Sequence, residues 1–274
     1  MKVERTQADD QSPHASGGRR LPWLMAAVHI GILWGLSMTA AADDLACPGS
    51  FLNSAQPEQA GQKWLGGQFV YAFGPEVSID PARIDVFESA CRALLDTTAL
   101  RCAPRELAPD APDYVYVVAG GHDFSYVGRQ GGCQLLSILS WNNPIVVAHE
   151  IKHALGWAHE QQHPDRERFI EVDFDAVPQR HQAEFRVRDL GNEGPYDFDS
   201  IMHFRPSDFA RPGAVAFRPR EGEVTRASVA GQRDHLSATD LKEIRAVYGA
   251  AGENRGEWTR QPALTANTTW TEEF

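Results

Sequence analysis

Basic residues are scarce in this sequence relative to acidic ones. Its 274 residues include 26 Lys and Arg against 37 Asp and Glu, which gives a formal net charge of −11 at pH 7. Nucleic-acid binding depends on clustered Lys and Arg side chains that neutralise phosphates. The acidic balance therefore argues against a nucleic-acid partner.

Long apolar runs are also scarce, since the sequence holds one, LPWLMAAVHIGILWGLSMTAAA at residues 21–42. This run follows Arg19 and Arg20 and ends in three alanines, a pattern typical of a signal peptide that is removed before Asp43. Its length also suits an uncleaved membrane anchor. We expect a secreted or periplasmic protein that contacts a membrane only if this segment is retained.

Composition divides the rest of the chain into further parts. Residues 1–20 form a polar N-terminal region, and residues 43–62 form a short lead or pro-segment with two prolines. Residues 63–250 carry the periodic apolar patterns of a folded domain. Little apolar material follows, so we expect residues 251–274 to be a mobile C-terminal tail.

Cysteine is infrequent, and no two cysteines have the CxxC spacing of a zinc knuckle. The four cysteines are Cys47, Cys91, Cys102 and Cys133. In an oxidising compartment they allow three disulfide pairings, among which the sequence does not choose. Cys91 and Cys102 also suit burial as small apolar side chains.

Apolar patterning predicts a mixed α+β fold for the folded domain. We expect strands near residues 66–73, 113–118, 125–127 and 133–139, and helices at residues 81–96, 144–155 and 238–248. The middle helix has the clearest ends, because Asn143 is a cap residue, Pro144 suits the first turn and Gly156 suits the C-terminus.

The middle helix carries the segment HEIKHALGWAH, residues 149–159. His149 and His153 lie four residues apart, so their imidazoles project from one face of the helix and can share one ion. Gly156 permits the left-handed turn that brings His159 back to the same ion. Three nitrogen ligands leave a fourth position for water, which is typical of a catalytic Zn²⁺ site.

Glu150 follows the first of these histidines and is rotated away from the metal-binding face. Its carboxylate is therefore placed to accept a proton from a metal-activated water without binding the metal itself. This arrangement predicts a general base for the hydrolysis of peptide bonds.

Several segments resemble the astacin family of zinc endopeptidases, within the metzincins. They are AHEIKHALGWAHEQQHPDR at 148–166, YDFDSIMHF at 196–204 and KWLGGQFVYAF at 63–73. The resemblance implies that residues 63–250 form a catalytic domain of two lobes. It implies an N-terminal lobe with a twisted mixed sheet and two long helices, and a mostly irregular C-terminal lobe with one late helix.

The resemblance also implies roles for individual residues. His149, His153 and His159 are implied to bind zinc, with Glu150 as the catalytic general base. Met202 matches the methionine of the family's Met-turn, which packs beneath the ligands. Ser125–Gly128 matches an edge strand that pairs with extended protein or peptide substrates.

One departure from the family pattern concerns Phe204, because the family usually has a tyrosine there. Phenylalanine can neither ligate zinc nor donate a hydrogen bond to an oxyanion. Tyr196, His203 and Arg205 are candidates for substrate or oxyanion contacts in its place. An alternative function is a zinc-binding protein of the same fold with weak or no turnover.

Cys47 precedes the domain and raises a second question. One hypothesis is that its thiolate occupies the open position on zinc and keeps the enzyme latent, because zinc prefers thiolate ligands. The alternative is an ordinary disulfide or a thiol that carries no lipid.

Overall fold

The computed structural model describes residues 47, 61–188 and 194–251. The expected signal peptide or anchor at 21–42, most of the lead and the tail from residue 252 lie outside the described residues. Within the described residues, no helix combines the length and the apolar character needed to cross a membrane.

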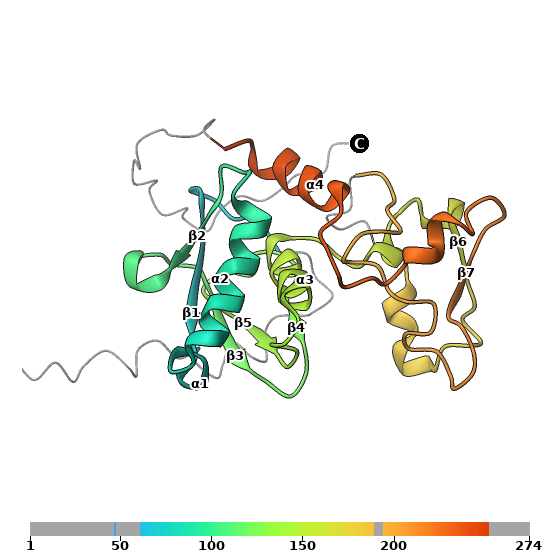
Figure 1. The fold of residues 1–274 in the computed structure, drawn as a ribbon, viewed down its shortest axis with the longest axis horizontal. Helices are drawn as coiled ribbons and strands as arrows, with labels where there is room; N and C mark the ends of the chain where they lie inside the picture. The colour runs from blue at the N-terminus through green and yellow to red at the C-terminus, as the bar shows by residue number, and fades with distance from the viewer. Residues whose placement is uncertain (1–46, 48–60, 189–193, 252–274) are drawn as a thin grey trace, which may run out of the picture. The chain divides into compact units, whose positions relative to one another are not determined.

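The N-terminal part of the domain contains a mixed sheet and three helices (Figure 1). Its elements are β1 (Gln68–Phe73), α1 (Pro75–Ser78), α2 (Pro81–Leu95), β2 (Arg101–Pro104), β3 (Tyr114–Ala119), β4 (Phe124–Ser125), β5 (Cys133–Ile138) and α3 (Pro144–Leu155). The strand order is β2-β1-β3-β5-β4, in which β4 is antiparallel to β5 and the other neighbours are parallel. The predicted mixed sheet and two long helices are confirmed.

Local capping explains where the two long helices begin. The Asp80 side chain accepts hydrogen bonds from the first amides of α2, and Pro81 follows it. The Asn143 side chain accepts from the amide of Ile145 at the start of α3. Gly156 then ends α3 with a φ of 122°, in the region that favours glycine.

Helices α2 and α3 pack on one face of the sheet, because alternate strand residues point to opposite faces. Phe69, Val115 and Leu136 point toward the helices and are fully buried in the larger core with residues of α2 and α3. Val70 and Cys133 point to the other face, where a smaller cluster includes Cys47. The helix-covered face thus supports α3, the helix that carries the histidine motif.

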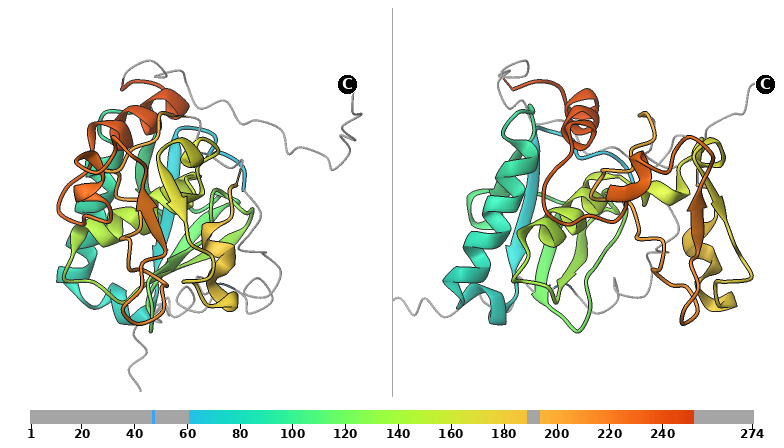
Figure 2. Two further views of the ribbon diagram at one scale, coloured as in Figure 1. Left: turned by 90° about the vertical axis from the view of Figure 1, so that its right-hand side faces the viewer. Right: turned by 45° about the vertical axis from the view of Figure 1, so that its right-hand side comes forward.

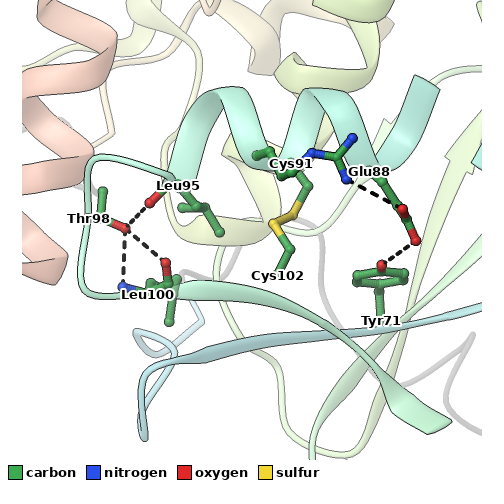
Figure 3. The surroundings of a disulfide bond; sticks show 8 residues. Tyr71, Glu88, Cys91, Leu95, Thr98, Leu100 and Cys102 are labelled. Carbon is green, nitrogen blue, oxygen red and sulfur yellow. Dashed lines mark hydrogen bonds and ion pairs between the residues drawn. A yellow bond between two sulfur atoms is a disulfide. The ribbon is translucent and has the colours of Figure 1, made fainter. Parts of the chain in front are cut away.

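Two disulfides settle the cysteine pairing. Cys91 of α2 bonds to Cys102 of β2, beside the hydrogen bond from the Tyr71 hydroxyl to Glu88 (Figure 3). This pair fixes α2 to the sheet, so the expectation that these two cysteines are merely small buried apolar residues is corrected. Cys47 bonds to Cys133 on the opposite face of the sheet.

The C-terminal part is mostly irregular and has a second core. It contains the two-stranded antiparallel sheet of β6 (Ile170–Val172) and β7 (Phe217–Pro219), which sequence patterning did not predict. Short 3₁₀ turns occupy Glu160–Gln162, Arg166–Arg168, Gln179–Phe185 and Arg226–Val229, and another, Arg105–Leu107, lies in the N-terminal part. The predicted irregular lobe is confirmed.

The late helix α4 (Ala238–Tyr248) has its predicted bounds, and the Ser237 side chain caps its start by accepting a hydrogen bond from the Asp240 amide. It packs with the first core through Ile244, next to α2, although it follows the C-terminal part in sequence (Figures 1 and 2). The β6–β7 pair lies on the opposite side of α3 from α2 (Figures 1 and 2). Helix α3 therefore belongs to the first core and lies on its side toward β6 and β7 (Figure 1).

Candidate metal centre and active site

Three histidine side chains converge at the C-terminal end of α3. One potential ligand atom from each of His149, His153 and His159 lies within 4.8 Å of the other two. The Nε2 atoms of His153 and His159 are 3.1 Å apart. Two nitrogens bound at about 2.0–2.1 Å to one tetrahedral zinc ion would be about 3.4 Å apart, so the spacing suits a shared ion.

Backbone carbonyls orient two of these rings. The Nδ1 atom of His149 is 2.6 Å from the carbonyl oxygen of Ile201, and the Nδ1 atom of His153 is 2.7 Å from that of Trp157. A carbonyl can only accept, so each Nδ1 carries the proton and donates it. This tautomer leaves each Nε2 with its lone pair for a metal.

Burial keeps the three imidazoles neutral. It lowers the pKa of His153 to about 4 and lowers the pKa of His149 and His159 well below the usual value. Mutual repulsion between the rings lowers the pKa of His149 and His159 further. Neutral imidazole is the form that binds metal, so the site is prepared for an ion at neutral pH.

Glu150 lies beside this cluster with a buried carboxylate. Among the described residues its Oε2 atom has no hydrogen-bond partner. Burial and the charge of Asp123 raise the pKa of Glu150 to about 8, against the opposing charge of Arg233. A divalent cation nearby would favour the ionised carboxylate and so lower this pKa.

These residues fit a zinc ion. Three neutral nitrogen donors with converging lone pairs are the ligand set of a catalytic zinc site, and two of them have oriented Nδ1 protons. The buried Oε2 atom of Glu150, without a hydrogen-bond partner among the described residues, is an available acceptor on the same helix.

Comparison with models of protein families shows to which family the chain belongs. The model of the peptidase family "Astacin" matches residues 56–249, which include the three histidines and Glu150. The chain belongs to the astacin family.

Individual astacin relatives agree. The chain is 34% identical over 162 residues to zinc metalloproteinase nas-14 of Caenorhabditis elegans, covering 55% of this chain and 30% of that protein. It is 31% identical over 192 residues to nas-6 of the same organism, covering 68% of this chain and 53% of that protein. The chain thus spans about a third to a half of these curated relatives.

The solved structure of a zinc-protease shows the same fold. High choriolytic enzyme 1, a hatching enzyme zinc-protease from Oryzias latipes, matches with a TM-score of 0.61 and 26% identity. The match covers 75% of this chain and 98% of that one. The predicted metzincin-type fold is confirmed.

The Met-turn residues of the astacin pattern lie close to the histidines. Met202 is fully buried in the larger core, and its carbonyl oxygen accepts a hydrogen bond from the Glu160 amide, next to His159. The Phe204 ring packs on the His159 ring, with centroids 4.3 Å apart. Phe204 therefore stands beside the metal centre, with no hydroxyl to offer it.

Two of the candidates for substrate or oxyanion contacts, Tyr196 and His203, make hydrogen bonds to other groups of the protein instead. The Tyr196 hydroxyl lies 2.7 Å from His203 Nε2, and His203 Nδ1 donates to the Phe204 carbonyl. His203 Nε2 is thus an acceptor, so the Tyr196 hydroxyl donates its proton there. Both residues are buried. The expectation that Tyr196 and His203 contact substrate or an oxyanion is corrected, because the two side chains are hydrogen-bonded to each other inside the C-terminal core.

Arg205, the third candidate, remains a prediction. It is exposed, and its Nε atom donates to the Gly231 carbonyl at 3.2 Å.

The hypothesis that Cys47 is a latency ligand is wrong for this structure. Its sulfur is bonded to Cys133, on the face of the sheet opposite α3. A disulfide sulfur is not the thiolate that zinc prefers.

Sequence reasoning missed Arg233. Its guanidinium donates to the carbonyls of His203 and Gln232, and its charge lowers the pKa of Glu150 and of all three histidines. No local motif signals this residue, because it reaches the site from a segment far along the chain from α3.

Proposed function

We propose that this chain is an exported zinc-dependent endopeptidase that cleaves protein or peptide substrates. The observation that carries the proposal is the convergence of three histidine side chains at the helix that also carries Glu150, whose buried Oε2 atom has no hydrogen-bond partner among the described residues. Bound zinc would supply Lewis acidity, which polarises a carbonyl and makes water a stronger acid.

His149, His153 and His159 would hold the metal, and Glu150 would act as the general base. Glu150 would take a proton from the attacking water and return it to the departing amine. Arg233 supports this role, because its positive charge favours the ionised form of Glu150. Met202 would support the ligands from below as an apolar base.

Substrate would bind in extended form along the expected edge segment Ser125–Gly128, of which Ser125 belongs to strand β4. This strand is the last in the sheet and pairs antiparallel with β5 on one side. A peptide added on its other side would receive backbone hydrogen bonds that make little demand on side chains. That mode suits an endopeptidase, which must accept varied internal sequences.

Export would follow from the segment at 21–42. We expect protein recovered outside the cytoplasm to begin at Asp43, which N-terminal sequencing would check. Retention of the segment in a membrane fraction would show an anchored form instead.

Glu150→Ala tests the catalytic proposal. We expect it to lower the hydrolysis of denatured casein by about 10²–10⁴-fold, the range for loss of a general base. Zinc content, measured by atomic absorption, is expected to stay at one ion per chain. The matched control is Glu106→Ala, at an exposed glutamate outside the site, with unchanged hydrolysis.

The alternative function is a zinc-binding protein of the same fold with negligible turnover. Phe204 favours it, because the ring beside His159 offers no hydrogen-bond donor. Equal background hydrolysis by wild type and Glu150→Ala, with zinc bound in both, would establish this alternative.

A further inference from the structure

Lys152 is a buried cation on the helix that carries the histidines. Its side chain is fully buried between the two helices α3 and α4, directly before His153 in sequence. The Nζ atom donates to Asp240 Oδ1 at 2.6 Å and to Glu243 Oε2 at 3.3 Å. Burying a charge is costly unless it is paired, so this group depends on α4 for its partner.

Asp240 connects Lys152 to the turn beneath the metal centre. Its carboxylate is fully buried and accepts from the Ser200 hydroxyl at 2.7 Å and from the Ile201 amide at 3.1 Å. It also accepts from the Ser237 amide at the start of α4. One carboxylate thus joins α3, α4 and the segment from Ser200 to Met202.

Ile201 carries this restraint to the first histidine. Its amide is held by Asp240, and its carbonyl oxygen accepts from His149 Nδ1 at 2.6 Å. Groups that orient a metal-binding histidine through its second nitrogen commonly control metal affinity. The position of the Ile201 carbonyl therefore matters to the ligand.

A second contact leads from Lys152 toward His153. The Nζ atom lies 5.6 Å from the centre of the Trp157 ring, within cation–π range. The Trp157 carbonyl accepts from His153 Nδ1 at 2.7 Å. Lys152 is thus connected to both residues whose carbonyls orient the histidines. It contacts Trp157 directly, and it reaches Ile201 through its ion pair with Asp240.

We propose that Lys152 and Asp240 are positioning residues of the metal centre, whose buried ion pair fixes the two carbonyls that orient His149 and His153. The inference rests on the proposed zinc site. Neither side chain touches metal or substrate, and both act through the backbone of Ile201 and Trp157.

Zinc affinity and ligand geometry test this role separately from folding. The variants are Lys152→Met, Asp240→Asn and the milder Ser200→Ala, which removes the hydroxyl that donates to Asp240 and accepts from the Met202 amide. Lys242→Met is the control, since Lys242 is an exposed lysine on the same α4 helix. Each protein is measured by chelator competition for zinc, by the visible spectrum of its cobalt-substituted form and by thermal unfolding of its metal-free form.

We expect Lys152→Met and Asp240→Asn each to weaken zinc binding by about 10–100-fold and to alter the cobalt spectrum. Ser200→Ala is expected to change the zinc affinity and the cobalt spectrum in the same direction but by less. Lys242→Met is expected to change neither quantity. The double variant of Lys152 and Asp240 is expected to lose less than the product of the two single losses, because the pair acts as a unit.

Wild-type zinc affinity and cobalt spectra in the folded variants would overturn the proposal, whatever their unfolding temperatures. If the two charge variants do not fold, Ser200→Ala decides by the same criterion. Wild-type protein that binds no zinc would instead overturn the proposed function, and this inference with it.

Discussion

At the scale of single residues, Phe204 is the sharpest departure from the astacin pattern. Its ring lies against His159, where a tyrosine would place a hydroxyl beside a proposed metal ligand. One oxyanion donor is worth about 10²–10³ in kcat in characterised hydrolases. We therefore expect Phe204→Tyr to raise kcat tenfold or more with little change in KM, measured on a fluorogenic peptide.

The matched control is Phe209→Tyr. The Phe209 ring packs on Phe204 rather than on a histidine ligand, with centroids 5.1 Å apart. A hydroxyl added there is one ring further from the metal centre, so kcat is expected to stay the same. Equal kcat values for Phe204→Tyr and wild type would show that the missing hydroxyl does not limit turnover.

His203 makes stability depend on pH. Burial and the charge of Arg233 lower its pKa from 6.5 to about 4, although the hydrogen bond to the Phe204 carbonyl opposes them. The unfolded chain takes up the proton at the higher pH, so the stability that neutral His203 contributes is present above pH 6.5 and is lost as the pH falls to 4. The difference in pKa corresponds to roughly 3 kcal/mol.

His203→Gln removes this titration. Urea unfolding at pH 7 and pH 4.5 is expected to show a smaller acid loss for the variant than for wild type. The control His235→Gln is expected to show no such reduction, because the hydrogen bond from exposed His235 to Asp199 raises the pKa of that histidine. An unchanged acid loss in His203→Gln would contradict the assignment.

Residue-level prediction succeeds where the chemistry is local. His149, His153 and His159 share one helix and the turn after it, so their spacing alone indicates a shared ion. Lys152 and Asp240 are 88 residues apart, and nothing in their local patterns shows that they meet. The prediction for Tyr196 is wrong because proximity in sequence to the Met-turn does not reveal which way a side chain points.

At the scale of elements, the three long helices are predictable from the sequence, whereas the four-residue helix α1 and the strands β6 and β7 are not. Capping residues and apolar spacing mark both ends of α3 and α4, and the structure gives α4 its predicted bounds. Strands β6 and β7 have three residues each and pair across a long stretch of irregular chain. So short a strand has too few residues to show alternation, and its stability comes from the second core.

The packing of α4 also lies beyond sequence patterning. A late helix after an irregular lobe predicts its existence, but its burial against α2 depends on the chain returning to the first core. That return brings Asp240 to Lys152 and Ser200. Helix α4 thus packs on the first core and, through Asp240, also holds the turn at Ser200 and Ile201.

At the scale of the whole domain, the histidines connect two separate cores. His149 and His153 belong to α3 of the larger core, whereas His159 packs on Phe204 of the second core. An ion bound by all three would therefore hold the two cores together. Because unfolding separates the ligands, metal binding adds to the free energy of unfolding.

Zinc removal tests this connection. We expect a chelator to abolish casein hydrolysis and to lower the free energy of unfolding, by about 2.7 kcal/mol relative to protein at a free zinc concentration of 100 times Kd. Both losses are expected to reverse when zinc is added back.

Two variants show whether the ion joins the cores. In Glu150→Ala the stability loss on zinc removal is expected to be as large as in wild type, because Glu150 is not a proposed ligand. In His159→Ala it is expected to be much smaller, since the ion would lose the ligand that reaches the second core. Calorimetric scans of the three proteins with and without chelator would measure this, and equal losses in wild type and His159→Ala would show that the ion does not join the cores.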